Sequence, residues 1–179
     1  NWLKLNNMYY KRLIGTNIYL SPSDKENEKN ILIKWFNEDT DIINNNNFSR
    51  LLVSEDKLKE IIDKWTDGPY YFSIIAKDDD TFVGTVSLFN ITPYSAELGI
   101  FIGKDYRNRG YGKEAMNLIK DFAFNFINLK ALHINVLGFN EKALSAYQKV
   151  GFKECGRWHQ INYFNGAYYD TIMMEVLRG

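Results

Sequence analysis

The sequence predicts an α/β fold, with a mixed, mostly antiparallel central sheet flanked by helices. Three runs rich in β-branched and aromatic residues, at 70–76, 82–89 and 96–102, follow one another through short polar connections. Such spacing is typical of antiparallel neighbours. A segment of helical periodicity then separates the third run from an apolar run at 131–136. A crossover helix of this kind places the next strand parallel to its neighbour.

The 179 residues predict one domain, over residues 8–179. We expect a native start at Met8, with residues 1–7 a tag or a frayed end. A formal net charge of +0 argues against nucleic acid or a membrane surface as an obligatory partner. The single cysteine, Cys155, excludes an internal disulfide framework and fits a reducing, cytoplasmic location. One cysteine and two histidines give no basis for a zinc site, so we expect no metal.

The N-terminal third predicts one strand, at 14–20, and two helices. The first helix begins at the turn Ser21-Pro22-Ser23-Asp24, and Ser54 caps the second. Between them, the acidic and asparagine-rich stretch 38–47 predicts a loop, either solvated or on the acceptor side of a site. The apolar faces of the two helices are Ile31, Leu32, Trp35 and Phe36, then Leu58, Ile61, Ile62 and Trp65.

The C-terminal half predicts two helices and two closing strands. Apolar residues at helical spacing indicate a helix over 110–125, and Asn140 is the N-cap of another. The strands 153–161 and 168–177 are joined through Asn165-Gly166, a strong hairpin signal.

The stretch from Leu98 to Ala115 passes from a strand through a basic glycine turn into a helix. Glycines let the backbone approach a phosphate closely, and the amides and dipole of a helix N-terminus favour an anion. Arg107 and Arg109 can add charge-assisted hydrogen bonds. This stretch therefore predicts an anion site.

Three phosphate-binding patterns can be compared with this turn. A Walker A loop fails, because Glu114 stands where Ser or Thr is required. A dinucleotide fingerprint fits Gly110, Gly112 and Ala115. The preceding strand, however, ends several residues too early, and no acid ends the next strand. The third pattern, Arg/Gln-x-x-Gly-x-Gly/Ala, is met by Arg107, Gly110 and Gly112.

A second block follows one helix and one strand later: Asn140-x-x-Ala143-x-x-x-Tyr147-x-x-x-Gly151-Phe152. Together the two blocks resemble the GNAT-type N-acetyltransferase superfamily, and the resemblance covers roughly residues 70–177. The tail at 151–170 resembles the branch that acts on ribosomal-protein N-termini and polyamines. The resemblance implies a GNAT-like acyl-CoA N-acyltransferase fold and acetyl transfer from acetyl-CoA, a co-substrate, to a primary amine.

The resemblance also implies where CoA is held. Its pantetheine arm is expected to lie along the strand before the glycine turn and to bond main-chain groups there. Asn140 is expected both to cap its helix and to contact the CoA arm. The cofactor-binding residues so implied are Ile100, Phe101, Ile102, Arg107, Asn108, Arg109, Gly110, Tyr111, Gly112, Lys113 and Asn140.

Two residues are candidates for proton transfer. Tyr147 has a phenol that is protonated at neutral pH and could donate to the leaving thiolate; alternatively, it is a core tyrosine bonded to a carbonyl. Glu97 leaves the face of Leu98 and Ile100 and could accept a proton from the amine; alternatively, it is an exposed strand carboxylate and bulk water is the base.

We expect an N-acetyltransferase whose partner is an amine-bearing small molecule or a peptide N-terminus, with a homodimer also considered. Residues 36–48 and the aromatic hairpin 158–169 are the expected acceptor walls; alternatively, these aromatics form the core of a hairpin or a dimer contact. The alternatives are a non-catalytic acyl-CoA-binding module of the same fold and a dinucleotide-binding domain. The sequence leaves the acceptor open.

Overall fold

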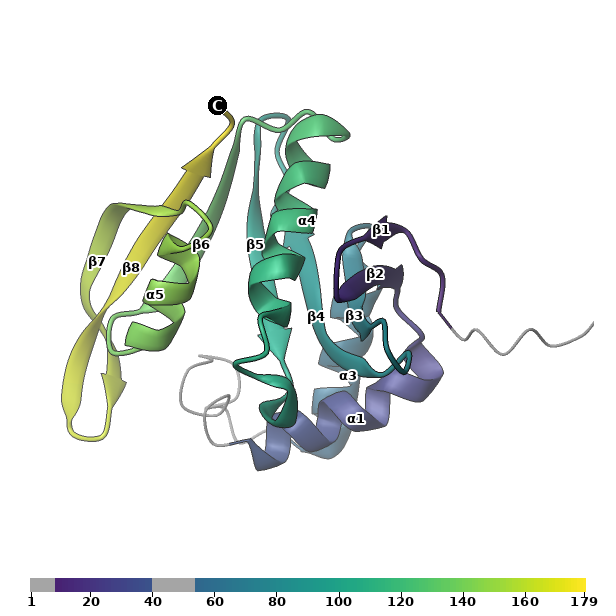
Figure 1. The fold of residues 1–179 in the computed structure, drawn as a ribbon. Helices are drawn as coiled ribbons and strands as arrows, with labels where there is room; N and C mark the ends of the chain where they lie inside the picture. Colours follow the sequence, from purple (N-terminus) through teal and green to yellow (C-terminus); the bar gives the residue numbers. More distant parts are fainter. Residues whose placement is uncertain (1–8, 40–53) are drawn as a thin grey trace, which may run out of the picture.

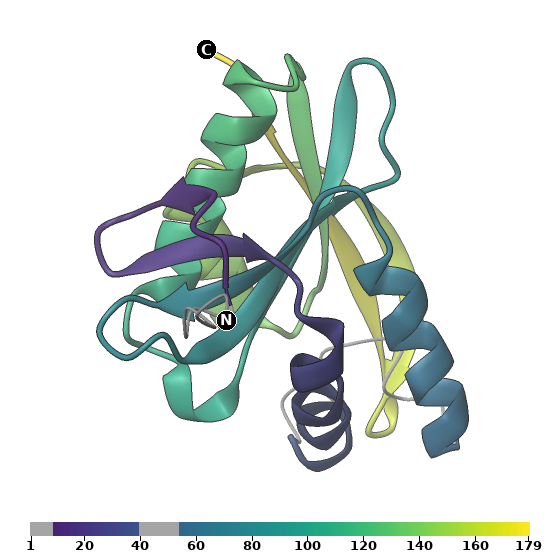
Figure 2. The same cartoon turned by 90° about the vertical axis from the view of Figure 1, so that its right-hand side faces the viewer.

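The residues that the structure describes form one eight-stranded sheet. Helices cover both of its faces, which Figures 1 and 2 show from two sides. The computed structural model describes residues 9–39 and 54–179. The strands lie in the order β1-β2-β3-β4-β5-β6-β8-β7, and within these two ranges only β5 and β6 pair in parallel. The predicted fold class, a mixed and mostly antiparallel sheet flanked by helices, is confirmed.

The described elements follow the predicted order closely. They are β1 (Leu13–Ile14), β2 (Ile18–Pro22), α1 (Lys25–Glu38), α3 (Glu55–Thr66), β3 (Tyr71–Ala76), β4 (Phe82–Phe89), β5 (Ser95–Ile102), the 3₁₀ turn η1 (Lys104–Tyr106), α4 (Tyr111–Asn125), β6 (Ala131–Leu137), α5 (Glu141–Gln148), β7 (Lys153–Phe164) and β8 (Ala167–Leu177). From residue 40 on, the loop predicted for 38–47 lies outside the described residues, as do residues 1–7.

The prediction of a single first strand is wrong, because a tight turn divides it into β1 and β2. The amide of Gly15 donates to the carbonyl of Ile18 at 2.9 Å and closes the turn. The carboxylate of Glu114, in the first turn of α4, accepts from the backbone amide of Asn17 at 2.9 Å. This turn is therefore stabilised from a distant element that local sequence does not reveal.

One face of the sheet is covered by α4, whose buried residues pack on β4, β5 and β6 in the larger core. The other face carries a second core, in which Leu32 and Phe36 of α1 and Leu58 and Ile62 of α3 pack on Tyr19, Ile75 and Phe82. The helix faces predicted for α1 and α3 need one correction each. In α1, Ile31 is exposed while Ile33 is buried. In α3, Trp65 is partly exposed at the border of the apolar face, where its ring contacts Phe36.

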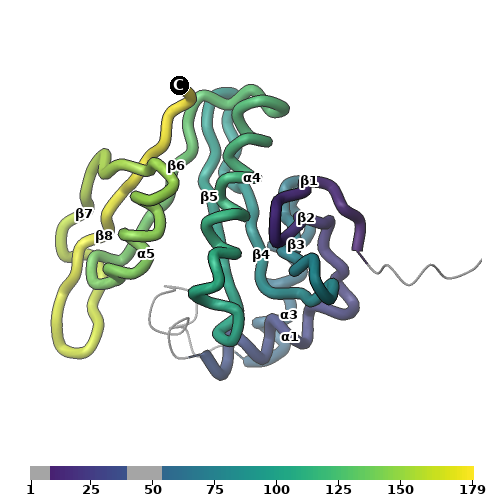
Figure 3. Tube along the Cα trace, viewed as in Figure 1, coloured from purple at the N-terminus to yellow at the C-terminus, as the bar shows by residue number. Residues whose placement is uncertain are grey.

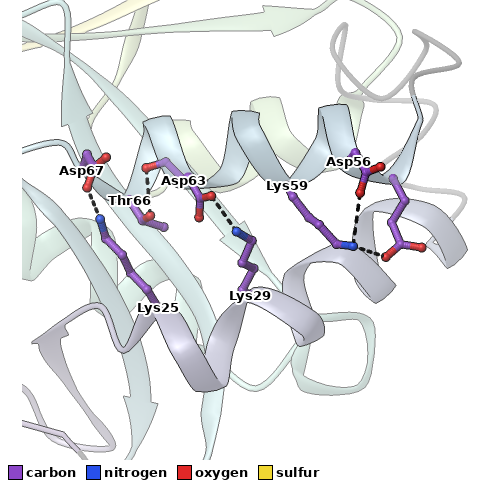
Figure 4. A network of polar contacts seen from close by, with 8 residues as sticks. Lys25, Lys29, Asp56, Lys59, Asp63, Thr66 and Asp67 are labelled. Carbon is purple, nitrogen blue, oxygen red and sulfur yellow. Dashed lines mark hydrogen bonds and ion pairs between the residues drawn. The ribbon is translucent and has the colours of Figure 1, made fainter.

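Polar contacts fasten α1 to α3 (Figure 4). Lys25 pairs with Asp67, and Lys29 Nζ lies 2.6 Å from Asp63 Oδ2. The Thr66 hydroxyl donates to the carbonyl of Asp63 at 3.1 Å. The lysine pairs are partly exposed, so they fix the alignment of the helices more than they add to stability.

The closing hairpin has the turn that its sequence predicts. Asn165 and Gly166 have φ angles of 47° and 84°, the left-handed pair that a type I′ turn requires. Among the helices of the described residues, none is long and apolar enough to cross a membrane.

Candidate functional site

A cleft of about 1280 Å³ opens where β5 and β6 separate. The two strands pair only at Ser95–Ala131, Ala96–Leu132 and Glu97–His133, and then diverge towards the N-terminal ends of α4 and α5 (Figure 3). The separation exposes one edge of β5 between the two helix ends. The interruption of the sheet therefore creates a groove long enough for an extended ligand.

The cleft collects the residues that the sequence singles out. Every predicted site residue lines it except Arg109, whose guanidinium lies over the ring of Tyr106 at 5.8 Å from the ring centre. The predicted residues in the lining are Glu97, Ile100, Phe101, Ile102, Arg107, Asn108, Gly110, Tyr111, Gly112, Lys113, Asn140 and Tyr147.

The exposed edge of β5 offers peptide groups at alternate residues. The amide of Gly103 donates to the carbonyl of Val83, so odd-numbered residues of β5 turn their peptide groups towards β4. Ile100 and Ile102 consequently turn theirs towards the cleft. This corrects the expectation for Phe101: its peptide groups belong to the β4 pairing, and its ring packs on Trp35 and Phe36 of α1.

The N-terminus of α4 has the form of an anion cradle. Gly110 adopts φ 85°, a left-handed conformation that admits glycine readily, and its carbonyl accepts the first helical bond, from Glu114. The amides of Gly112 and Lys113 precede that bond and have no intrahelical acceptor. A Cβ on Gly112 would meet Ile102 at 3.5 Å. Close backbone, free amides and the helix dipole fit a phosphate group.

Arg107 is engaged within the protein. Its Nε donates to the carbonyl of Ile102 at 3.0 Å, and its Nη2 pairs with Oδ2 of Asp39. Asp39 is only 4% exposed. The predicted phosphate-binding side chain is thus also the partner of a buried carboxylate.

Tyr147 lies on the inner face of α5, half-buried against the main core, with its ring edge-on to Phe152 at 6.1 Å. Burial raises the pKa of Tyr147 to about 12. No group in residues 9–39 or 54–179 forms a hydrogen bond with its hydroxyl, which the alternative of a structural core tyrosine would require. The phenol keeps its proton over the whole physiological range.

Asn140 has the geometry for both expected roles. Its Oδ1 accepts from the amide of Ala143 at 3.1 Å, which caps α5. The side-chain NH₂ is not used in that bond, and the residue lines the cleft. Capping therefore leaves a donor available to a ligand.

Glu97 lies on the opposite face of the sheet from α4, in the row that includes Gly99 and Phe101. Its Oε1 accepts from Asn90 Nδ2 at 3.0 Å. A Cβ on Gly99 would lie 3.1 Å from the Phe89 ring, so this ring covers the glycine beside Glu97. The carboxylate thus faces the cleft next to an aromatic wall.

A second aromatic wall was not found from the sequence. Phe139 lines the cleft from the β6 side and contacts Phe164 and Tyr169, with ring centres 5.1 and 4.8 Å away. Its position just before the Asn140 cap was the available signal. Of the predicted hairpin wall, Trp158 is outside the cleft lining and 51% exposed.

Comparison with known proteins gives a consistent result. Residues 18–153 match the acetyltransferase (GNAT) domain family. The chain is 27% identical to spermidine N(1)-acetyltransferase of Vibrio cholerae over 85% of this chain and 83% of that protein. It is 28% identical to the putative ribosomal N-acetyltransferase YdaF of Bacillus subtilis over 56% of each chain. The crystal structure of spermidine N-acetyltransferase from Vibrio cholerae with CoA and spermine superposes with a TM-score of 0.78, at 24% identity, over 91% of this chain and 96% of that one.

Proposed function

The chain belongs to the GNAT acetyltransferase domain family and is an N-acetyltransferase, and from this premise we propose that it transfers an acetyl group from acetyl-CoA to a primary amine by direct attack on the thioester. The observation that carries the proposal is the cleft between β5 and β6. It presents the edge of β5, the N-terminus of α4, the phenol of Tyr147 and the carboxylate of Glu97 to one space.

The cofactor side of the cleft is the side of α4 and α5. The free amides of Gly112 and Lys113 would hold the pyrophosphate, and the peptide groups of Ile100 and Ile102 would hold the pantetheine arm like an added strand. The Asn140 NH₂ faces the same space. The bound co-substrate supplies an acetyl group activated as a thioester.

The reaction joins the amine nitrogen to the acetyl carbon and breaks the carbon–sulfur bond. Glu97 would take the proton that the amine loses, directly or through water. Tyr147 would donate a hydrogen bond to the sulfur as negative charge develops there. Because its pKa of about 12 lies above that of an ordinary thiol near 8.5, we expect stabilisation of the thiolate more than complete proton transfer.

The acceptor side of the cleft suits an amine on an apolar or extended arm. The ring of Phe89 lies beside Glu97, and Phe139 also lines the cleft, from the β6 side. A primary ammonium can approach the carboxylate while its arm packs on aromatic rings. Relatives named for spermidine and for ribosomal acetylation support polyamines and peptide N-termini as the first acceptors to try.

The test is release of CoA thiol from acetyl-CoA with a panel of amines: spermidine, a ribosomal-type N-terminal peptide, an arylalkylamine and an amino sugar. We expect turnover with at least one of them that depends on both acetyl-CoA and amine. Binding of CoA without turnover of any amine in a broad panel would favour the non-catalytic alternative for this chain.

We also propose a single N-acetyltransferase domain over residues 8–179, a cytoplasmic location, no metal requirement and a homodimer in solution. Light scattering tests the assembly. Activity after treatment with a chelator tests the metal requirement.

A further inference from the structure

We infer that Arg107 is a positioning residue that orders the loop before α4, and that it does not bind the phosphates of CoA. The inference rests on the proposed function and specifies how the cofactor side of the cleft is built. It also revises the role that the sequence pattern suggests for this side chain.

The contacts of Arg107 occupy its guanidinium on two sides. Nη1 donates to Asp39 Oδ1 at 3.4 Å, Nη2 pairs with Asp39 Oδ2, and Nε donates to the carbonyl of Ile102 at 3.0 Å. Arg107 is 26% exposed and Asp39 only 4%. Withdrawing the guanidinium to reach a phosphate would break its ion pair with Asp39, and separating opposite charges at a carboxylate that is buried this deeply is unfavourable.

Three elements meet at this guanidinium. Asp39 ends α1, and its backbone amide donates to the carbonyl of Trp35 at 3.0 Å. Ile102 ends β5, and Arg107 itself lies three residues before the left-handed Gly110. Arg107 therefore joins the end of a helix, the end of a strand and the glycine turn.

A second contact supports the same junction. A Cβ on Gly103 would lie 2.5 Å from the Trp35 ring, so the backbone after β5 packs directly on the last turn of α1. The polar contacts of Arg107 with Asp39 and Ile102, together with the packing of Gly103 on the Trp35 ring, hold the two ends of this loop. The loop is thereby fixed before any ligand arrives, which favours binding because less freedom is lost.

The hydrogen bond from Arg107 to Ile102 also limits what the edge of β5 can offer to a ligand. The carbonyl of Ile102 faces the cleft but already accepts from Arg107, so the ligand would bond to the Ile102 amide and the Ile100 peptide groups. The charge of Arg107 is offset by Asp39, and the α4 amides remain the principal donors to an anion. The orientation of those amides towards the anion depends on the conformation of the loop that Arg107 holds in place.

The experiment measures the dissociation constant of CoA by calorimetry for wild type, Arg107→Gln, Asp39→Asn and the double variant. If Arg107 binds phosphate, Asp39→Asn removes a negative charge that competes for its guanidinium, and the affinity for CoA stays unchanged or improves. If Arg107 is a positioning residue, Asp39→Asn weakens CoA binding at least roughly fivefold, as Arg107→Gln does. A change of this size is usual for residues in contact that act together.

The double variant keeps the test decisive if a single variant unfolds, because its two amides can bond each other without a buried charge. We expect it to bind CoA more tightly than Arg107→Gln. Equal or weaker binding by the double variant would overturn the inference, as would Asp39→Asn that folds and binds CoA like wild type.

Two controls separate this result from others. Arg157→Gln, which breaks an exposed ion pair with Glu154, should leave CoA binding unchanged. A merely structural role would lower the unliganded melting temperature of Asp39→Asn but not its CoA affinity or the KM for acetyl-CoA, and that outcome overturns the inference. Failure of the wild type to bind CoA would instead overturn the proposed function.

Discussion

Asn90 donates a hydrogen bond from its side-chain amide to Oε1 of Glu97 at 3.0 Å. Asn90 follows β4 with a φ of 48°, and Glu97 is the third residue of β5, so the bond spans the connection between the two strands. It holds one carboxylate oxygen at the rim of the cleft. Within the described residues, the other oxygen has no hydrogen-bond partner and can receive a proton.

Glu97→Gln should lower kcat most at low pH, where the acceptor amine is charged and needs a base, and less at high pH. The pH profile of kcat for any active amine checks this. Glu175→Gln is the matched control, because Glu175 lies on the same face of the sheet, two strands away and outside the cleft lining. A change confined to the KM for acetyl-CoA would mean that the two faces are assigned in reverse.

Tyr147→Phe removes one hydroxyl and little volume. We expect kcat to fall roughly 10- to 1000-fold with little change in CoA affinity. Because the pKa of Tyr147 is about 12, the loss should be constant between about pH 6 and about pH 10. Steady-state kinetics test this loss of kcat, with Tyr163→Phe, at an exposed tyrosine, as the control. An undiminished kcat in Tyr147→Phe would show that the thiolate leaves without this phenol.

Gly110→Val should abolish CoA binding, because a β-branched residue does not hold φ 85° and the amides of α4 lose their alignment. Wild type with CoA at a hundred times Kd should gain about 2.7 kcal/mol, or a rise in Tm of about 5–10 °C. Gly166→Val is the matched control, since Gly166 has φ 84° in the closing hairpin. Gly166→Val should lower the Tm of the unliganded protein yet keep the rise in Tm that CoA causes. If Gly110→Val also keeps that rise, the glycine turn is not the CoA site.

Gly112→Val should act differently from Gly110→Val. The added carbons would enter the space next to Ile102, which a Cβ already meets at 3.5 Å, without requiring a left-handed backbone. We expect nearly wild-type stability and a large loss of CoA affinity by steric block. Calorimetry and unliganded melting, taken together, distinguish the two glycines.

Glu28→Gln tests a carboxyl that is fully buried in α1. Burial raises the pKa of Glu28 above its usual 4.5, although the Ser23 hydroxyl donates to it at 2.7 Å. A raised folded pKa favours the protonated form, so its stabilising effect is complete below about pH 4.5 and is lost as pH rises through the folded value.

The glutamine variant stays neutral, so its unfolding free energy relative to wild type should increase over that pH window. The increase should be about 1.4 kcal/mol for every tenfold difference between the acid dissociation constants of Glu28 in the folded and unfolded chains. Urea denaturation from acid to neutral pH measures the difference. Glu60→Gln, on the exposed side of α3, provides the control. A pH-independent difference would show that Glu28 is equally charged in the folded and unfolded chains.

Local patterns were sufficient wherever a contact is close in sequence. The β-branched and aromatic run at 82–89, the Asn165-Gly166 turn and the Asn140 cap are all recognised from neighbours within a few residues. The turn at Gly15 was missed because its carboxylate partner, Glu114, is 97 residues from Asn17. Likewise, Arg107 and Asp39 are 68 residues apart, and no spacing rule joins them.

The residues of the candidate site were likewise predicted where the relevant contacts are close in sequence and missed where they are distant. The glycine turn and the Tyr147 block have spacings fixed by one helix each, so all but one of the site residues predicted from sequence do line the cleft. Phe139 escaped because its role depends on contacts with Phe164 and Tyr169 in a hairpin that folds back on it. Trp158 was misplaced because aromatic content does not show which side of an edge strand turns inward.

The short pairing of β5 with β6 has a consequence for how the molecule unfolds. Three residue pairs join β5 to β6 within the sheet, and beyond them the two strands diverge. Backbone pairing across this seam between β5 and β6 is therefore sparse, and in native-state hydrogen exchange we expect its amides to exchange faster than those of the fully paired strands on either side. A ligand lying along Ile100 would bridge the seam, so slowed exchange should extend to amides of β6 and β8 that it never touches.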